Sequence, residues 1–279
     1  MLAPSVKHIR HVRLNIALRF AWRELRGGLR GFGVFIACIA LGVTAIAGVG
    51  SVAASLNDGL ASAGRTILGG DLDFSLIQRE ASPAEQNFLD AHGTVSLVGT
   101  LRAMARTSDG RSNLIEAKAV DGNYPLVGAV VTDPLLSLPA LFAQTGGAYG
   151  AAVDPTLLTR LDLKIGDRIT VGNIAVELRA VLKSEPDKIG GAIGLGPRVL
   201  MSEAALRATG LLQPGSLVRW QYRLHLPENA ASDSAVAALT KQAQQDFPDA
   251  GWEIRSRSKA SPQLERSVDR FTQFLTLVG

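Results

Sequence analysis

The chain has 279 residues, of which 47% are hydrophobic and 19% are charged, and its formal net charge is +4. This length provides enough residues for one or two domains with a sizeable core. Seven lysines and arginines against one glutamate give residues 1–30 a charge of +6, so the remainder carries −2. Because the remainder is nearly neutral, the sequence argues against a nucleic-acid-binding domain.

A long segment without charged residues follows this basic region, between Arg30 and Asp58. A helix from Gly31 to Ala54 would be about 36 Å long, which is enough to cross a hydrocarbon layer of about 30 Å. We therefore predict a transmembrane helix over residues 31–55. The preceding positive charge predicts that residues 1–30 are cytoplasmic and that the chain after the helix is exported.

Small side chains recur at steps of three and four along the predicted span, which favours close approach of a second membrane helix. The predicted packing face consists of Gly33, Ala37, Ala40, Thr44, Gly48 and Ser51. The alternative is that glycine and alanine are simply common in membrane helices.

Residues 1–30 also contain an amphipathic pattern that is typical of a helix lying in the membrane interface. The predicted anchors, which would contact the headgroup region and anionic lipid, are Arg19, Trp22, Arg23, Arg26 and Arg30. The alternative is that these arginines only set the topology of the span, and both interpretations can hold together.

The segment after the span predicts a stalk helix over residues 56–69, which leads into a domain over residues 70–261. Ser82-Pro83-Ala84-Glu85 is typical of a helix start, because the serine and the glutamate can both bind free backbone N–H groups. Alternating apolar residues predict the strands. The elements expected in the first half are a strand at 71–77, a helix at 83–91 and strands at 94–107 and 113–120. This order indicates an α+β fold.

A change of composition marks residues 132–196, where glycine and proline are frequent and the expected strands are short. We interpret this region as a β-rich insertion within the domain. Its expected elements are a helix at 152–161, strands at 168–171 and 174–182, and a loop at 183–196. Beyond it we expect strands at 198–201, 217–226 and 252–255, and helices at 202–209 and 231–247.

Residues 262–279 repeat apolar side chains at intervals of four and three, which is typical of a helix that packs along a seam. We predict that this segment pairs with the helix at 56–69 as a stalk and begins a second membrane span that continues beyond Gly279. The seam would consist of Leu56, Leu60, Leu264, Val268 and Phe271. The alternative is an amphipathic helix that packs on the domain.

We find no pattern for a catalytic, cofactor-binding or metal-binding site. The glycine-rich segment at 190–196 lacks the Lys-Ser/Thr pair of a phosphate-binding loop. Asp71 and Asp73 share one face of a predicted strand, which we interpret as a solvated face rather than a metal site. The chain has four histidines, His8, His11, His92 and His225. Their spacing along the sequence does not match that of metal ligands.

Five segments together resemble YbbP-type permeases, which belong to the broader FtsX/MacB superfamily of ABC transporters. They are ALRFAWRELRGGLRGFGVFIACIALGVTAIAGVGSVAASL, LGGDLDFSL, IEAKAVDGNYPLVG, the EPD of residues 185–187, and GPRVLMSEAALRATGLLQPGSLVRWQYRL. The resemblance extends over nearly the whole chain. It implies a transmembrane helix followed by a MacB-like periplasmic core domain, a mixed sheet with helices and a β-rich insertion.

The resemblance also implies a function, which is that of a permease subunit and not of an enzyme. A separate ATPase subunit would bind ATP on the cytoplasmic side of the inner membrane, and the spans would carry motion through the stalk to the periplasmic domain. The cargo would be lipid-like or hydrophobic. The implied partners are the ATPase, membrane lipid, and a second permease copy or a pseudo-dimer half within a longer multi-pass chain. A periplasmic partner protein is compatible with this arrangement.

Two other classes of protein stay open at this point. The first is a membrane-anchored sensor or binding module with a single span, which predicts that the gene ends soon after Gly279. The second is a secreted enzyme or lipid-binding protein, released from a signal peptide with its mature start near Ser55.

Overall fold

The computed structural model of the chain describes residues 33–44, 48, 64–187 and 196–259. The chain divides into two compact units, residues 1–57 with 268–279 and residues 58–267. In the first unit, residues 33–44 form a helix whose side chains are exposed. Among the described residues, no helix combines the length and the apolar character that crossing a membrane requires.

Several predicted residues lie outside the described part of the chain. They are Arg19, Trp22, Arg23, Arg26, Arg30, Ser51, Leu56, Leu60, Leu264, Val268 and Phe271. The remaining members of the predicted packing face are helical, and they are Gly33, Ala37, Ala40, Thr44 and Gly48. Their packing role, the stalk and the transmembrane helix over 31–55 stay predictions.

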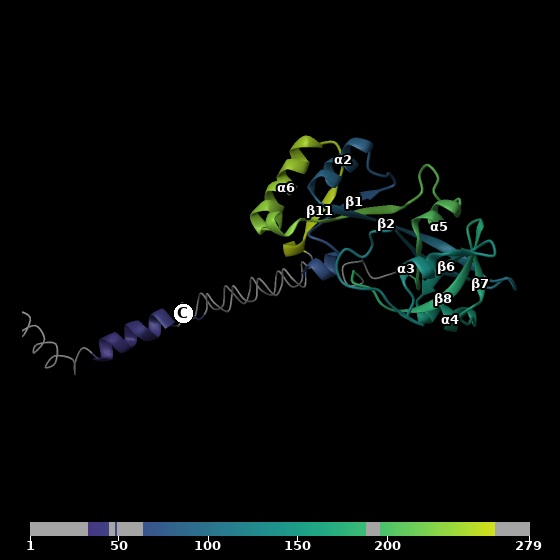
Figure 1. The fold of residues 1–279 in the computed structure, drawn as a ribbon, viewed down its shortest axis with the longest axis horizontal. Helices are drawn as coiled ribbons and strands as arrows, with labels where there is room; N and C mark the ends of the chain where they lie inside the picture. Colours follow the sequence, from purple (N-terminus) through teal and green to yellow (C-terminus); the bar gives the residue numbers. More distant parts are fainter. Residues whose placement is uncertain (1–32, 45–47, 49–63, 188–195, 260–279) are drawn as a thin grey trace, which may run out of the picture. The chain divides into compact units, whose positions relative to one another are not determined.

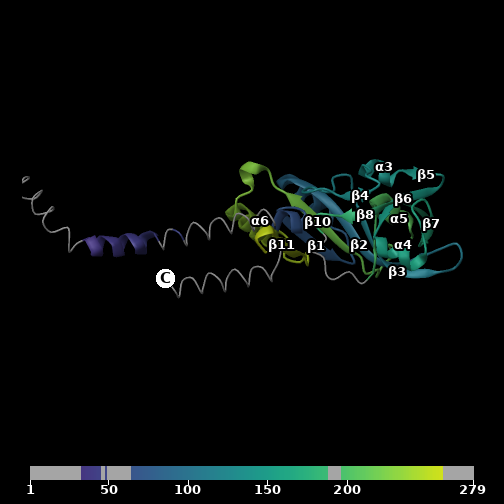
Figure 2. The same ribbon diagram turned by 90° about the horizontal axis from the view of Figure 1, so that it is seen from below.

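The described residues of the second unit are built on one sheet of eleven strands (Figures 1 and 2). Neighbouring strands follow the order β11-β1-β10-β2-β3-β9-β6-β8-β4, with β5 beside β6 and β7 beside both β2 and β8. The pairs β3–β9 and β6–β8 are parallel, and the other pairs are antiparallel. The strands are β1 (Leu72–Ile77), β2 (Thr94–Arg106), β3 (Ser112–Val120), β4 (Val131–Asp133), β5 (Gln144–Thr145), β6 (Ala148–Val153), β7 (Arg168–Val171), β8 (Ile174–Ser184), β9 (Arg198–Ser202), β10 (Arg219–His225) and β11 (Glu253–Ser256).

Two helices, α2 (Pro83–His92) and α6 (Asp233–Asp246), lie side by side at the end of the sheet that holds β1 and β11 (Figure 1). An aromatic cluster joins them, because the ring of Phe88 on α2 lies 5.3 Å from that of Phe247 at the end of α6. The ring of Trp252 lies 5.2 Å from that of Phe247. The other helical segments are α3 (Leu138–Phe142), α4 (Pro155–Leu161), α5 (Glu203–Ala208), η1 (Glu228–Ala230) and η2 (Arg257–Lys259).

The start of α2 confirms the predicted capping residues. The Ser82 hydroxyl accepts a hydrogen bond from the Glu85 backbone N–H at 3.4 Å, and the Glu85 carboxylate accepts one from the Ser82 N–H at 2.7 Å. Arg79 binds the same carboxylate through two contacts of 2.8 Å. These reciprocal bonds satisfy N–H groups that a helix start otherwise leaves free.

Most expected elements are confirmed to within a few residues, but the helix expected at 152–161 is partly wrong. Ala152 and Val153 end strand β6, and α4 begins only at Pro155. The cause is local, since the Asp154 carboxylate accepts the Thr156 N–H at 2.9 Å and so fixes the helix start after the strand. The loop expected from residue 183 is also shorter, because β8 continues to Ser184.

The region 132–196 contains four elements that the sequence did not indicate, β4, α3, β5 and β6. Its strands belong to the same sheet as the rest of the unit, because β6 pairs with β9. The domain boundaries at 70–261 and the extent of the insertion stay predictions.

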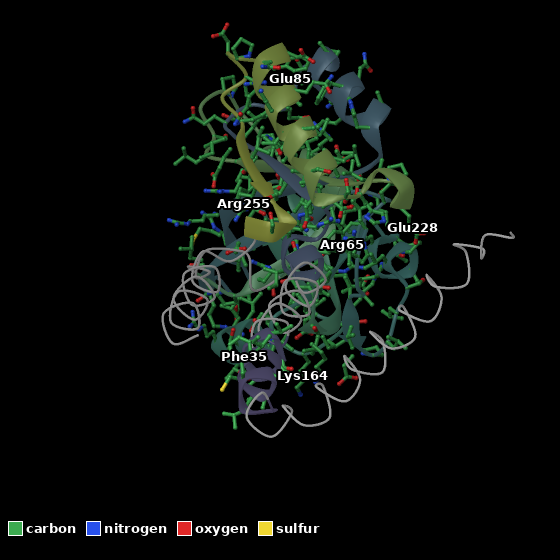
Figure 3. The ribbon with its side chains drawn as sticks, turned by 90° about the vertical axis from the view of Figure 1, so that its left-hand side faces the viewer. Phe35, Arg65, Glu85, Lys164, Glu228 and Arg255 are labelled. Atoms are coloured by element: carbon green, nitrogen blue, oxygen red, sulfur yellow. The ribbon has the colours of Figure 1, made fainter. Side chains whose placement is uncertain are left out.

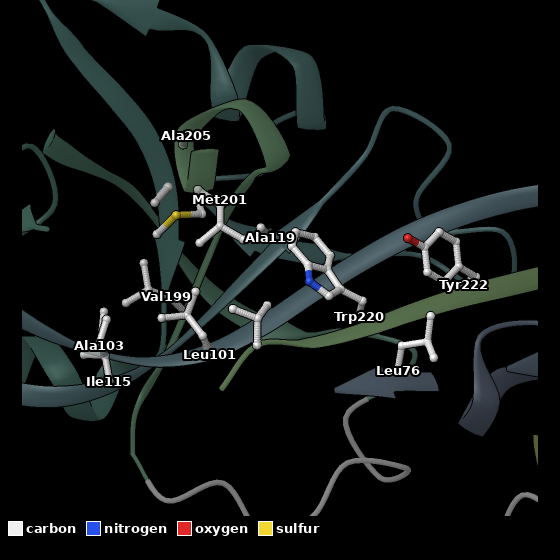
Figure 4. Packing of buried hydrophobic residues seen from close by; sticks show 14 of the residues in the cluster. Leu76, Leu101, Ala103, Ile115, Ala119, Val199, Met201, Ala205, Trp220 and Tyr222 are labelled. Atoms are coloured by element: carbon white, nitrogen blue, oxygen red, sulfur yellow. The ribbon is translucent and has the colours of Figure 1, made fainter. Parts of the chain in front are cut away.

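One face of the sheet carries the main hydrophobic core (Figure 4). Leu76, Leu101, Trp220 and Tyr222 project there from neighbouring strands and are less than 9% exposed. Because side chains alternate along a strand, the residues between them project from the opposite face. On that opposite face, a second hydrophobic cluster that includes Val98, Val120 and Leu200 lies beside the polar side chains of the candidate site.

Candidate functional site

Four adjacent strands place polar side chains on the face away from the main core. Asp73 of β1 lies opposite Arg223 of β10, and Gln221 of β10 lies opposite Ser75 of β1. Farther along the sheet, Lys118 of β3 pairs with Thr100 of β2. Asp73, Lys118 and Arg223 are each less than 5% exposed, so this face is covered and not solvated.

The centre of the face is a buried ion network around Lys118. The Lys118 ammonium donates to Glu185 at 2.8 Å and to Asp187 at 2.6 Å, and it also donates to the Tyr124 hydroxyl at 3.0 Å. Lys118 is 2% exposed. Buried charges need such partners, because an unpaired ion in the interior is costly. We call the whole set the Lys118 network, and its members are Lys118, Glu116, Tyr124, Glu185, Asp187, Arg198 and Arg223.

Arginines complete the network at both sides. Arg223 forms an ion pair with Asp187, while Arg198 bridges Glu185 and Glu116. The three cations and three carboxylates balance in formal charge. The network thereby ties β3, β9 and β10 to the loop that follows β8.

The pKa values in the network follow from this balance. Burial alone would raise the pKa of Asp187, but the charges of Arg223 and Lys118 outweigh it and hold that pKa below its usual range. Burial raises the pKa of the Tyr124 hydroxyl, and the nearby Asp187 and Glu185 raise it further. Tyr124 therefore stays neutral, and its hydroxyl donates a hydrogen bond to Asp187 at 2.8 Å.

A second cluster lies at the two ends of the described part of this unit. Asp71, just before β1, accepts hydrogen bonds from Arg65 at 2.8 Å and from Arg257 at 2.5 Å. Arg257, just after β11, also binds Asp233 at the start of α6, at 2.8 Å. Figure 3 shows Arg65 beside the end of the β11 segment. We call Asp71, Arg65, Arg257 and Asp233 the Asp71 clamp, and it joins the incoming segment to the outgoing one.

The environment of Asp71 favours its charged form. Burial would raise the pKa of Asp71, but the Leu226 backbone N–H and the side chains of Arg257 and Arg65 lower it by more. His225 lies 3.0 Å from the same carboxylate. The clamp is therefore an ion cluster centred on the carboxylate of Asp71.

The interpretation of Asp71 and Asp73 as a solvated face is wrong, since both are 0% exposed. Strand β1 is not an edge strand, because β10 and β11 pair with its two sides. Asp73 accepts hydrogen bonds from Arg255 at 2.7 Å and from Gln221 at 3.0 Å. Among the described residues, no group of three His, Cys, Asp or Glu side chains is placed to hold a metal ion.

The backbone is also in close contact at the clamp. A methyl group added to Gly64 would overlap the carbonyl oxygen of Arg257. We expect Gly64→Ala to lower the free energy of unfolding by about 1–3 kcal/mol, because this overlap outweighs the gain of about 1 kcal/mol that alanine brings to a helix. Thermal unfolding would measure the change. Gly122→Ala is the control, because nothing lies within 4 Å of the added methyl group, and an equal loss in both variants would contradict the expectation.

The structure brings together segments that the sequence presented separately. Glu116, Lys118 and Tyr124 lie in IEAKAVDGNYPLVG, Asp187 ends the EPD segment, and Arg223 lies in VRWQYRL. The sequence analysis missed the Lys118 network. The sequence pattern that could have indicated this network is the alternation of charged residues in β3 and β10. The same pattern is also typical of a solvated face.

Comparison with known proteins identifies the family of the chain. The family model of the MacB-like periplasmic core domain matches residues 32–244, and the chain belongs to this family. The chain is similar to the uncharacterised ABC transporter permease YbbP of Escherichia coli (strain K12), with 30% identity over 263 residues. This match covers 93% of the chain and 30% of the permease, so the chain spans less than a third of that relative.

Two solved structures are also similar to the chain. The periplasmic region of MacB from Actinobacillus actinomycetemcomitans is 7% identical, with a TM-score of 0.46, and the match covers 74% of this chain and 95% of that one. The extracellular domain of the transporter YknZ from Gram-positive bacteria is 11% identical, with a TM-score of 0.41, and the match covers 66% and 100%.

Proposed function

We propose that the chain is part of the permease subunit of an ABC transporter in the inner membrane, with its large domain in the periplasm. A separate ATPase subunit binds and hydrolyses ATP in the cytoplasm. The helix over 31–55 spans the membrane and packs on a second membrane helix. The cargo is lipid-like or hydrophobic. Family membership and the similarity to a permease support this proposal.

The observation that carries the mechanical part of the proposal is the Asp71 clamp. Arg65 and Arg257 lie near the two ends of the described part of this unit, and both bind one buried carboxylate. A displacement of either segment is therefore passed to β1 and β11 rather than absorbed by a loose connection. In the proposal, ATP binding moves the spans, the stalk moves with them, and the clamp transmits this motion to the sheet.

The test uses the full-length permease with its ATPase in proteoliposomes. We expect Arg65→Ala to lower transport of a lipid probe by about tenfold while ATP hydrolysis continues, because the incoming segment is released from Asp71. The matched control is Arg111→Ala, since Arg111 is also half-exposed and pairs with Asp109 at 2.6 Å on the turn between β2 and β3. Equal effects of the two variants would contradict transmission through the clamp. Failure of the protein to associate with an ATPase would instead favour a membrane-anchored binding module.

A further inference from the structure

A cavity of about 760 Å³ lies against the polar face of the sheet. Its volume is typical of sites for small molecules, which are about 300–1,000 Å³. Two acidic side chains, Glu116 and Asp187, line it together with six cationic ones. The cationic side chains are Arg102, Lys118, Arg198, Arg219, Arg223 and Arg255.

The cationic excess remains when the buried partners are included. Glu185 pairs with Lys118 and Arg198, and Asp73 pairs with Arg255. The exposed Glu253 also pairs with Arg219, at 3.7 Å, and counting all three carboxylates still leaves six positive charges against five negative ones. A confined excess of one sign of charge raises the local concentration of ligands of the opposite sign.

The guanidinium of Arg223 is only partly paired, which is the strongest evidence for an anionic ligand. Its side chain is 5% exposed, and only one of its nitrogen atoms, Nη2, pairs with Asp187. Among the described residues, no acceptor binds its Nε or Nη1. Buried donors without acceptors are costly, so negative charge in the adjoining cavity would stabilise this guanidinium.

The cavity also has an apolar side. Ile77 and Leu217 line it and are 53% and 74% exposed, although both are large hydrophobic residues. Leu68 lines the same cavity. The cavity therefore offers a cationic region beside an exposed apolar one.

We propose that this cavity binds an anionic amphiphile, with a carboxylate or phosphate headgroup at the arginines and an acyl chain along Ile77 and Leu217. The exposed Arg102 and Arg219 receive the headgroup at the rim, while Arg223 and Lys118 supply positive potential from below. This assignment deepens the proposed function, because it rests on a lipid-like cargo and specifies its charge.

The experiment uses the whole chain in nanodiscs without ATP, so that binding is tested apart from transport. The probe is lysophosphatidic acid with a diazirine on its acyl chain, and mass spectrometry identifies the labelled peptides. We expect labelling of peptides that contain Ile77 or Leu217, and about tenfold weaker labelling by lysophosphatidylcholine with the same acyl chain. Excess glycerol 3-phosphate should compete weakly, because it lacks the acyl chain.

Variants relate the labelling to the cavity. Arg102→Gln combined with Arg219→Gln should reduce labelling by about tenfold, since each exposed guanidinium contributes to headgroup binding. Arg160→Gln is the control, because Arg160 is exposed on α4 and does not line the cavity.

Equal labelling by the two lipids, or equal effects of the variants, would overturn the cavity assignment. Full competition by glycerol 3-phosphate would also overturn it, by showing a phosphate site in place of an amphiphile site. Absence of labelling in the unmodified chain, together with intact ATP-driven transport, would overturn the cavity assignment while leaving the proposed function standing.

Discussion

Asp71→Asn is expected to lower the free energy of unfolding of the domain by about 3–5 kcal/mol, which is the usual cost of removing one partner of a buried ion pair. The amide keeps the shape of the side chain but removes its charge. Arg257, which is 6% exposed, would then lose its buried counter-ion and keep only Asp233, which is 70% exposed. Urea titration followed by tryptophan fluorescence would measure the loss, because Trp220 and Trp252 both lie in this domain.

The pH dependence provides an independent check of this expectation. The pKa of Asp71 is lowered in the folded state, so its contribution is complete above the unfolded value of about 3.9 and is lost as the pH falls through the lowered folded value. The difference between Asp71→Asn and the unmodified protein should therefore shrink below about pH 4. Asp249→Asn is the control, because Asp249 is exposed, and it should leave stability unchanged. A difference that stays constant down to pH 2 would mean that the charge of Asp71 does not stabilise the fold.

Much of the fold could be predicted because local chemistry decides it. The start of α2 follows from Ser82 and Glu85, because the side chain of each accepts a hydrogen bond from the backbone N–H of the other. The turn between β2 and β3 follows from Ser108-Asp109-Gly110, where Gly110 has a φ of 91°. Such signals lie within a few residues of the element that they specify.

The candidate site could not be predicted in the same way, because its partners are far apart in the sequence. Asp71 meets Arg257 across 186 residues, and Lys118 meets Asp187 across 69. Alternating charged residues in a strand are compatible with a solvated face and with a buried ion network. The choice depends on what covers the strand, and here the segment at Glu185–Asp187 covers Lys118.

The Lys118 network provides the second large expected effect. Lys118→Met should lower the free energy of unfolding by about 3–5 kcal/mol, because Glu185 and Asp187 lose a shared cation while both remain buried. Adding Glu185→Gln to this variant should restore part of the loss, because one positive and one negative charge have then been removed together. The same urea titration, applied to both single variants and the double variant, would measure this coupling.

The difference between the double variant and the sum of the two single variants shows whether Lys118 stabilises the domain through its charge or only through its packing. In the double variant, Asp187 keeps Arg223 and Glu116 keeps Arg198, so each remaining carboxylate still has a guanidinium partner. We therefore expect the double variant to be more stable than the sum of the single changes predicts, by about 1–3 kcal/mol. Lys164→Met on the exposed turn before β7 serves as the control and should change stability by less than about 0.5 kcal/mol. Additive losses would show that Lys118 stabilises the sheet through its packing and its bond to Tyr124, and that the two carboxylates do not depend on its charge.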